Sequence, residues 1–291
     1  MANRKIKTVL LKRKQDTNKG DYGHVFAIAG SLGMTGAAYL TAQAALLSGS
    51  GLVTLGIPKS LNTILARKLV EVMTKPLPET KEQSLSVKAF SEIEKFIKLR
   101  KPDVLAIGPG LSQNNETQAL VRKIIAKIDL PMVIDADGLN AIAGHLDLLA
   151  TSHYTLATKI ITPHPGEMAR LLGIGVAQVQ KNRKNIAKEA VAKYNVIVVL
   201  KGHGTVMAGP KGHVYINNTG NPGMASAGCG DVLTGMIASF VGQGIEPFEA
   251  AKLGVYLHGK AGDIAAKETG QASLKATDLL NNISEAIRAL A

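Results

Sequence analysis

Short apolar runs alternate with helical segments along most of this 291-residue chain. Several runs are almost continuously apolar, which is typical of parallel strands covered by helices on both faces of a sheet. A repeated strand–helix–strand order also implies right-handed crossover connections. The runs expected to form strands are residues 25–29, 52–57, 104–107, 132–134, 159–162 and 196–200.

The remaining segments complete an α/β architecture. Residues 205–208 and 213–217 flank a Gly-Pro-Lys-Gly turn and predict a β-hairpin near the end of the sheet. The expected helices are residues 35–48, 84–99, 116–128, 176–194, 228–241, 247–267 and 275–290. We therefore predict a three-layer sandwich, with a mostly parallel central sheet flanked by helices. Residues 1–291 are expected to form one domain, with residues 1–18 as a basic N-terminal arm or helix.

The formal net charge of +12 raises the question of nucleic-acid binding. Half of this charge lies in residues 1–20, which contain seven basic residues and one acidic residue. Aromatic residues make up 4% of the chain, and no basic stretch is interleaved with them, so platforms for stacked bases are absent from the pattern. We expect no nucleic-acid partner. The positive charge is instead suited to attracting a small polyanionic ligand.

The sequence also predicts a cytoplasmic location. No segment is long and apolar enough to span a bilayer, and the N-terminus lacks a sustained apolar signal core. Cys229 is the only cysteine, so no disulfide can form within the chain. We expect no membrane partner.

Residues 220–235 read G-N-P-G-M-A-S-A-G-C-G-D-V-L-T-G, a glycine-rich approach to an apolar helix. Glycines let the main chain come close to a ligand, and the N-H groups at a helix start attract anions. An anion hole is therefore predicted at Ala227, Gly228, Cys229 and Gly230. Asp231 comes directly after these residues. It could act as a base in phosphoryl transfer, or it could be an ordinary acidic residue of the first helical turn. These residues alone favour the two interpretations about equally.

Other candidate residues follow the expected strands, where ligands of open α/β sheets bind. D-A-D-G-L-N contains two carboxylates, Asp135 and Asp137, which could help to hold hydrated Mg²⁺, whereas Asp135 could instead cap the turn. For Asp137 we favour a capping role at the following helix. His164 is fixed between two prolines, and its position in this series of loops favours ligand contact over a purely structural role.

Residues 198–205 read V-V-L-K-G-H-G-T and place Lys201 at the end of a buried strand. A lysine there can neutralise phosphate, although its stem could also cover apolar surface with the ammonium in water. The phosphate interpretation is modestly favoured. An earlier glycine-rich loop contains Gly30, Gly33 and Gly36, but this spacing differs from the dinucleotide-binding fingerprint. A hydride-transfer site of that type is excluded.

The motifs occur in one order: G-D-Y-G-H-V at 20–25, A-G-S at 29–31, D-A-D-G-L-N at 135–140, T-P-H-P-G-E at 162–167, L-K-G-H-G-T at 200–205, and G-N-P-G-M-A-S-A-G-C-G-D at 220–231. On these motifs the chain resembles the ADP/ATP-dependent NAD(P)H-hydrate dehydratases of the ribokinase-like superfamily. The resemblance runs from about Lys19 to the last expected helix. T-P-H-P-G-E together with G-N-P-G-M-A is far more specific than the glycine-rich aspartate motif, which indicates only the superfamily.

The resemblance implies a Mg²⁺-dependent repair enzyme that restores NADH or NADPH from its S-form hydrate while ADP or ATP is consumed. It favours ADP, because the chain resembles a stand-alone dehydratase, and it implies a homotetramer. Asp231 is the implied catalytic base. The hydrate is expected to contact Ala37, Gly110, His164 and Asp231. The nucleotide is expected to contact Lys201, Gly202, His203, Gly204, Thr205 and Gly230. The metal ligands are not assigned.

Two alternatives remain. A ribokinase-like kinase of a sugar or vitamin precursor would use the same anion hole and aspartate. Sugar kinases of this type usually carry a β-sheet lid, whereas residues 52–104 contain no clear hairpin, so we predict no such subdomain. A non-catalytic nucleotide sensor would need Lys201 and the glycines but not Asp231.

The chain departs from the family pattern at two positions. Cys229 stands where serine or threonine is more common, and Asn18 stands where a histidine is common. Because Cys229 is expected at a helix N-terminus, we hypothesise a lowered thiol pKa and inactivation by alkylation.

Overall fold

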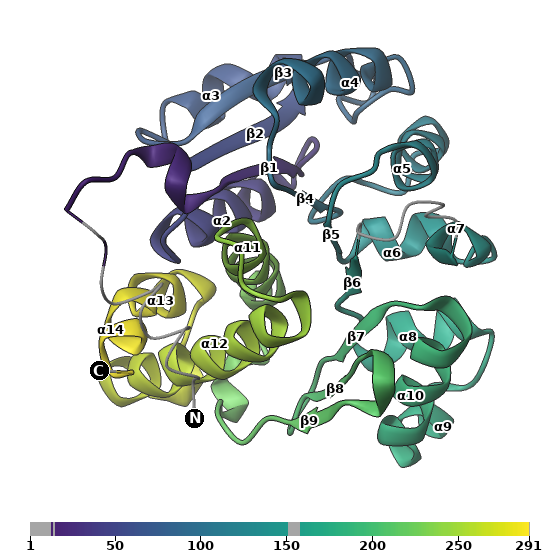
Figure 1. Ribbon diagram of the computed structural model, residues 1–291, viewed down its shortest axis with the longest axis vertical. Coiled ribbons are helices and arrows are strands. Elements are labelled where there is room, and N and C mark those ends of the chain that lie inside the picture. The colour runs from purple at the N-terminus through teal and green to yellow at the C-terminus, as the bar shows by residue number, and fades with distance from the viewer. Residues whose placement is uncertain (1–12, 14, 151–157, 291) are drawn as a thin grey trace.

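The computed structural model describes residues 13, 15–150 and 158–290. These residues build one nine-stranded sheet in the order β3-β2-β1-β4-β5-β6-β7-β8-β9 (Figure 1). The seven strands from β3 to β7 in this order are parallel, and β8 and β9 are antiparallel to their neighbours. The strands are β1 His24–Ile28, β2 Leu52–Pro58, β3 Met73–Leu77, β4 Val104–Ile107, β5 Met132–Ile134, β6 Lys159–Ile161, β7 Ile197–Leu200, β8 Val206–Ala208 and β9 Val214–Ile216.

Helices cover both faces of this sheet (Figure 1). The first face is covered by α2 Thr35–Leu47, α11 Cys229–Gly242, α12 Pro247–Thr269, α13 Ala276–Asn281 and α14 Ile283–Arg288. The second face is covered by α4 Ala89–Arg100, α5 Asn115–Lys127, α6 Asp137–Ile142, α8 Pro165–Leu172 and α10 Arg183–Tyr194. Shorter helices are α3 Asn62–Ala66, α7 Asp147–Ala150 and α9 Val176–Lys181.

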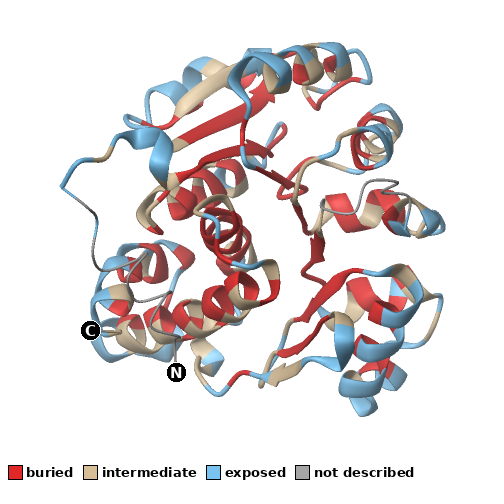
Figure 2. Cartoon of the chain, viewed as in Figure 1, coloured by how far each residue is buried: buried red, intermediate tan, exposed pale blue. Residues whose placement is uncertain are grey.

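The apolar strand sequences explain these layers. In β1, Val25 and Ala27 face one hydrophobic core, whereas Phe26 and Ile28 face the other. Successive side chains of a strand point to opposite faces, so a fully apolar strand needs a helix layer on each side. Figure 2 shows the buried residues gathered along the sheet and on the helix surfaces that face it.

All six predicted parallel strands and the hairpin are confirmed to within one or two residues. The β3 strand was missed because Lys75 and Pro76 interrupt its apolar pattern. It pairs only with β2, and proline is tolerated at such a sheet edge because one side of the strand needs no ladder donor. All strands named in the described residues belong to this sheet, as expected for a fold without a separate β-lid.

Three helix predictions need correction. The helix expected from residue 84 begins at Ala89, because the preceding residues form a turn: the Ser84 main-chain oxygen accepts from the Thr80 N-H, and Leu85 forms an antiparallel bridge with Glu79. The segment 176–194 divides at Asn182, whose φ of −128° leaves the helical region. The segment 275–290 divides at Asn282, and α8 was not predicted.

The small residues of α2 let it pack closely on α11, which fixes the start of α11 beside the sheet. A Cβ atom on Gly235 would lie 2.1 Å from the main-chain oxygen of Thr41. This part of α2 therefore packs in the core, whereas the small residues alone could not distinguish a core helix from one at a subunit interface. Across the described residues, no helix has the length and apolar character needed to cross a bilayer.

The single-domain organisation stays a prediction. Residues 1–12 and 14 of the predicted basic arm lie outside the described residues.

Candidate active site

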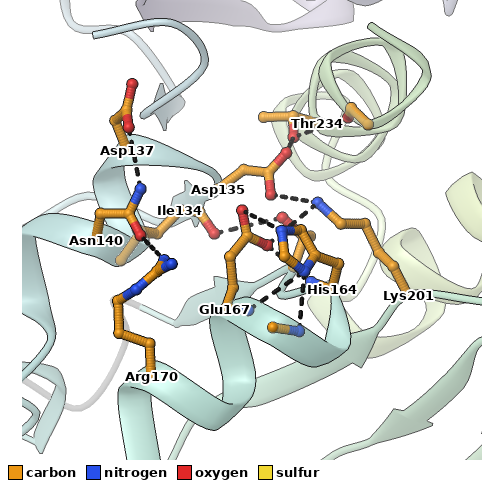
Figure 3. Close-up of polar contacts among 12 residues, drawn as sticks. Ile134, Asp135, Asp137, Asn140, His164, Glu167, Arg170, Lys201 and Thr234 are labelled. Atoms are coloured by element: carbon orange, nitrogen blue, oxygen red, sulfur yellow. Dashed lines mark hydrogen bonds and ion pairs between the residues drawn. The ribbon is translucent and has the colours of Figure 1, made fainter. Parts of the chain in front are cut away.

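Loops that are distant in sequence meet at the carboxyl ends of β5, β6 and β7, beside the start of α11. Figure 3 shows Asp135 after β5, Glu167 in the first turn of α8, and Lys201 after β7. These are the strand ends at which the sequence predicted a ligand site.

Lys201 and Asp135 form the centre of this cluster. The Lys201 Nζ donates to Asp135 Oδ1 at 2.6 Å and lies 3.8 Å from Glu167 Oε2. The Thr234 hydroxyl donates to the other Asp135 oxygen at 2.8 Å. Burial alone lowers the pKa of Lys201, but attraction to Asp135 and Glu167 outweighs it and the pKa is raised. The lysine is therefore a fixed positive charge at this site.

These contacts correct two interpretations. The alternative in which the Lys201 ammonium stays in water is wrong, because its side chain is only 19% exposed and is paired with Asp135. The Asp135 carboxylate is 1% exposed and bonds Lys201 and Thr234, so it does not cap the turn.

Asp231 lies in the first turn of α11 with an altered acidity. Burial raises its pKa to about 7, and the negative charges of Asp135, Asp137 and Glu167 add to this effect while Lys201 opposes it. Its main-chain oxygen accepts a hydrogen bond from the Thr41 hydroxyl at 3.2 Å. A carboxyl group with a pKa near 7 can accept a proton at neutral pH more readily than an ordinary aspartate.

The residues of the predicted anion hole lie at the start of α11. Gly228 precedes α11 with φ of 93° and provides no side-chain cap. Gly230 brings the first turn close to Lys201, since a Cβ there would lie 3.3 Å from its Nζ. Ala227 is exposed, and the Cys229 side chain points into the core. The start of α11 thus offers main-chain N-H groups beside a lysine.

The hypothesis of an acidic Cys229 thiol is wrong. Burial raises the thiol pKa and outweighs the hydrogen bond with Ser226, whose Oγ lies 3.5 Å from the Sγ. A buried thiol is inert compared with an exposed thiolate, so its position at a helix N-terminus does not make it reactive.

His164 and Glu167 form a reciprocal cap at the start of α8. The His164 Nδ1 accepts hydrogen bonds from the N-H groups of Gly166 and Glu167, and Glu167 Oε2 accepts from the His164 N-H. The His164 side chain is 54% exposed, with Nε2 3.5 Å from Glu167 Oε1. His164 therefore has a structural role through Nδ1, while its Nε2 lies beside the Glu167 carboxylate.

Glu167 ends the motif T-P-H-P-G-E, and its part in the site was missed in the sequence. Burial raises its pKa, although Lys201 acts in the opposite direction. A glutamate at the third position of a helix after a capping residue is a recognisable signal. Its proximity to Lys201 could be seen only in the tertiary structure.

Asp137 does not cap α6, contrary to expectation. It is the first residue of that helix, and Ala136 precedes it. The Asp137 carboxylate accepts hydrogen bonds from the Ser112 N-H at 2.9 Å and the Asn140 amide at 3.0 Å. It ties the loop after β4 to the loop after β5.

Ala37 and Gly110, both predicted to contact the hydrate, lie side by side. A Cβ atom on Gly110 would be 2.9 Å from the Ala37 Cβ, and the Gly110 oxygen accepts from the Ser31 hydroxyl. Ala37 shares a face of α2 with Thr41, four residues later. The Thr41 hydroxyl donates to the main-chain oxygen of Asp231. The structure thus connects this pair to the start of α11.

The L-K-G-H-G-T loop turns sharply through two glycines with positive φ, 135° at Gly202 and 59° at Gly204. The Thr205 hydroxyl donates to the Gly202 oxygen, and His203 is exposed. The predicted nucleotide loop therefore follows directly from Lys201.

Two residues of α12 support the glycine-rich loop and were missed in the sequence. His258 Nε2 lies 2.8 Å from the Cys229 oxygen, and burial lowers the His258 pKa to about 4, so the neutral ring donates this bond. Asp263 accepts from the Gly220 N-H and the Asn221 amide. Nothing in the helical pattern of α12 marks either residue as functional.

A family model described as NAD(P)H-hydrate dehydratase matches residues 25–285. The chain belongs to this family. The bifunctional NAD(P)H-hydrate repair enzyme of Moorella thermoacetica is 48% identical over 281 residues, which cover 97% of this chain and 52% of that protein. This dehydratase-family chain spans about half the length of several such bifunctional relatives.

Two further relatives match nearly the whole of their own length. The ADP-dependent (S)-NAD(P)H-hydrate dehydratase of Neisseria meningitidis is 35% identical over 269 residues, covering 91% of this chain and 84% of that protein. The ADP/ATP-dependent NAD(P)H-hydrate dehydratase of Bacillus subtilis, co-crystallised with ATP and Mg²⁺, superposes with a TM-score of 0.79. The two chains are 30% identical, and the superposition covers 98% of this chain and 96% of the other. Such matches confirm the predicted ribokinase-like fold.

Proposed function

We propose that this chain catalyses nucleotide-dependent dehydration of the S-form hydrate of NADH or NADPH. The observation that carries the proposal is Asp231, whose carboxyl group has a pKa of about 7 in the first turn of a glycine-led helix. A base of this acidity beside an anion site suits proton removal during phosphoryl transfer. Family membership supports the choice of substrate.

The proposed reaction begins at the hydroxyl group on the reduced nicotinamide ring. Asp231 takes its proton as the oxygen attacks the terminal phosphoryl group, and the bond from that phosphorus to the rest of the nucleotide breaks. The bond between the ring carbon and the phosphorylated oxygen then breaks, so that phosphate leaves with the former hydroxyl oxygen, and loss of a proton from the neighbouring carbon restores the dihydropyridine. The N-H groups from Ala227 to Gly230 would stabilise charge on the transferring oxygens.

Mg²⁺ fits the residues present at this site. The Asp135 and Glu167 carboxylates already converge on one cation, the Lys201 ammonium. These carboxylates would hold the ion through few direct contacts and several waters, as is usual for Mg²⁺. When bound, the ion would neutralise negative charge on the nucleotide phosphates. Among the described residues, no group of three or more His, Cys, Asp or Glu side chains is arranged for metal binding.

The two ligands would occupy adjoining parts of the site. Residues 201–205 and Gly230 would contact the nucleotide, with Lys201 supplying positive charge. Ala37, Gly110 and His164 would contact the hydrate together with Asp231. ADP is the proposed donor, by analogy with the Neisseria relative. The cytoplasmic location and the homotetramer stay predictions.

The proposal is tested by mixing the protein with chemically prepared NADH hydrate, Mg²⁺ and either ADP or ATP. We expect absorbance to rise in the reduced-nicotinamide band with one nucleotide or both, together with release of inorganic phosphate. The Asp231→Asn variant is the matched control and should show neither signal. A stable phosphorylated product without phosphate release would instead indicate a kinase, and binding without turnover would indicate a sensor.

A further inference from the structure

Arg183, the first residue of α10, reaches beneath the L-K-G-H-G-T loop. Its Nη1 donates to the His203 oxygen at 2.6 Å, and its Nη2 donates to the Leu200 and Lys201 oxygens at 2.8 and 3.1 Å. One guanidinium group therefore binds three main-chain carbonyl groups within four consecutive residues. A planar side chain with several fixed donors is suited to this task, whereas a single ammonium group is not.

The local packing is also specific. A Cβ atom on Gly202 would lie 3.2 Å from the Arg183 Nη2, and the φ of 135° at Gly202 is one that other residues rarely adopt. The glycine thus allows the loop to bend around the guanidinium. The Arg183 Nε is buried and has no hydrogen-bond partner among the described residues, so the two terminal nitrogens make the recorded contacts with the loop.

The Arg183 charge has no carboxylate partner among the ion pairs of the described residues. A partly buried cation is costly unless polar groups surround it, and the carbonyl oxygens of the loop provide that environment. They are consequently drawn toward α10. Carbonyl oxygens left free in this loop would repel a nucleoside phosphate, because they carry partial negative charge and the phosphate is an anion.

We propose that Arg183 is a positioning residue for the nucleotide: it holds the carbonyl groups of Leu200, Lys201 and His203 away from the bound phosphates and fixes the loop in its binding conformation. This inference rests on the proposed function, since it takes residues 201–205 as the nucleotide loop. Arg183 acts through the loop and does not touch the reacting atoms.

The inference predicts a selective effect on one of the two ligands. In Arg183→Met the side-chain length is similar but all donors are lost, so nucleotide affinity should fall about 10- to 100-fold, as expected for loss of a charge-assisted hydrogen bond. The KM for the hydrate should change little. Arg183→Lys should recover part of the affinity, because its ammonium retains the charge but not the planar arrangement of donors.

The matched control is Lys184→Met, which removes the same charge from the next, exposed residue of α10. Titration calorimetry with ADP and with ATP, in the presence of Mg²⁺, measures affinity directly, and a melting curve for each variant shows that it is folded. If Arg183→Met does not fold, Arg183→Lys is compared with wild type in the same titrations. The expected order of affinity is wild type and Lys184→Met, then Arg183→Lys, then Arg183→Met.

Equal nucleotide affinity in folded Arg183 variants and wild type would overturn the inference and leave the proposed function standing. An equal rise in the KM values for nucleotide and hydrate would also overturn it, because that result indicates a general structural role. A wild-type protein that binds neither nucleotide would overturn the proposed function itself, and the inference with it.

Discussion

At the scale of single residues, the proton affinity of Asp231 is set by its surroundings. Burial disfavours the charged carboxylate, and three further carboxylates lie close enough to increase this effect. Lys201 opposes them but is already paired with Asp135 at 2.6 Å. The same side chain on an open helix surface would be an ordinary acid.

Replacing Asp231 with Asn should abolish the proposed base while preserving the shape of the side chain. We expect kcat to fall by roughly 10² to 10⁴-fold, the usual contribution of general-base assistance. The variant should be no less stable than wild type above pH 7, because the buried carboxylate is charged there. Steady-state kinetics and thermal unfolding check both expectations, and retention of wild-type kcat would exclude Asp231 as the base.

The pH dependence of activity should follow the same carboxyl group. Because the pKa of Asp231 is raised to about 7, kcat/KM should fall as the pH decreases through 7 and the base becomes protonated. Asp137→Asn removes one of the charges that raise this pKa, so the acidic limb of the kcat/KM profile should move to lower pH. An amide oxygen can still accept from the Ser112 N-H, which preserves the loop contact. An unchanged limb in this variant would contradict the electrostatic explanation.

At the scale of elements, the site depends on how closely α2 and α11 approach each other. The start of α11 carries the proposed anion hole and Asp231, and Gly235 lies one turn further along the helix. Gly235 leaves no side chain between that turn and the Thr41 main chain. The position of the turn that carries Asp231 is therefore fixed by helix packing.

Gly235→Ala should separate these helices. The added Cβ would lie 2.1 Å from the Thr41 oxygen, so we expect a loss of about 1–3 kcal/mol in the free energy of unfolding. Gly36→Ala is the control, because Gly36 is also helical but has open space around its missing Cβ. That change should be neutral or stabilise by up to about 1 kcal/mol. Denaturant unfolding of both variants provides the comparison, and equal effects would contradict the packing argument.

At the scale of the whole molecule, the site joins the two helix layers. Asp231 and His258 come from helices on the first face of the sheet, and Glu167 comes from a helix on the second. Asp135 and Lys201 follow strands between these layers. Folding of the entire sandwich is needed to bring the five residues together, so site and stability are coupled.

The His258 pKa of about 4 predicts how global stability changes with pH. In the unfolded chain His258 takes up a proton below its ordinary pKa of 6.5, whereas the folded protein excludes that proton until about pH 4. The contribution of neutral His258 to the free energy of unfolding is thus complete above pH 6.5 and is lost as the pH falls toward 4. The loss is on the order of 3 kcal/mol.

His258→Gln retains a donor for the Cys229 oxygen but cannot be protonated. We expect wild type to lose more unfolding free energy than this variant between pH 7.5 and pH 4.5. Denaturant titrations at both pH values measure the difference. Parallel losses in the two proteins would show that His258 is not buried in its neutral form.

Local pattern was sufficient for much of the fold, with informative exceptions. The buried strands β1, β4 and β7 are apolar enough to be recognised without neighbours. The edge strand β3 was not, because Met73–Leu77 contains a lysine and a proline that only an edge position tolerates. The same holds for the candidate site. Asp231 and Lys201 could be recognised because they lie in glycine-rich motifs, whereas Arg183 and His258 could not, because they lie in ordinary helical sequence.

The strand–helix alternation, the glycine-led start of α11, the order of the loops and the family could all be predicted from the sequence. These depend on residue type and spacing, which are properties of neighbouring positions along the chain. The tertiary structure was needed to show the Lys201–Asp135 pair, the raised pKa values of Asp231 and Glu167, the burial of the Cys229 thiol and the hydrogen bonds of Arg183 to the loop after β7. Each of these depends on burial and on groups far away in sequence, because electrostatic and packing energies are set by distance in space.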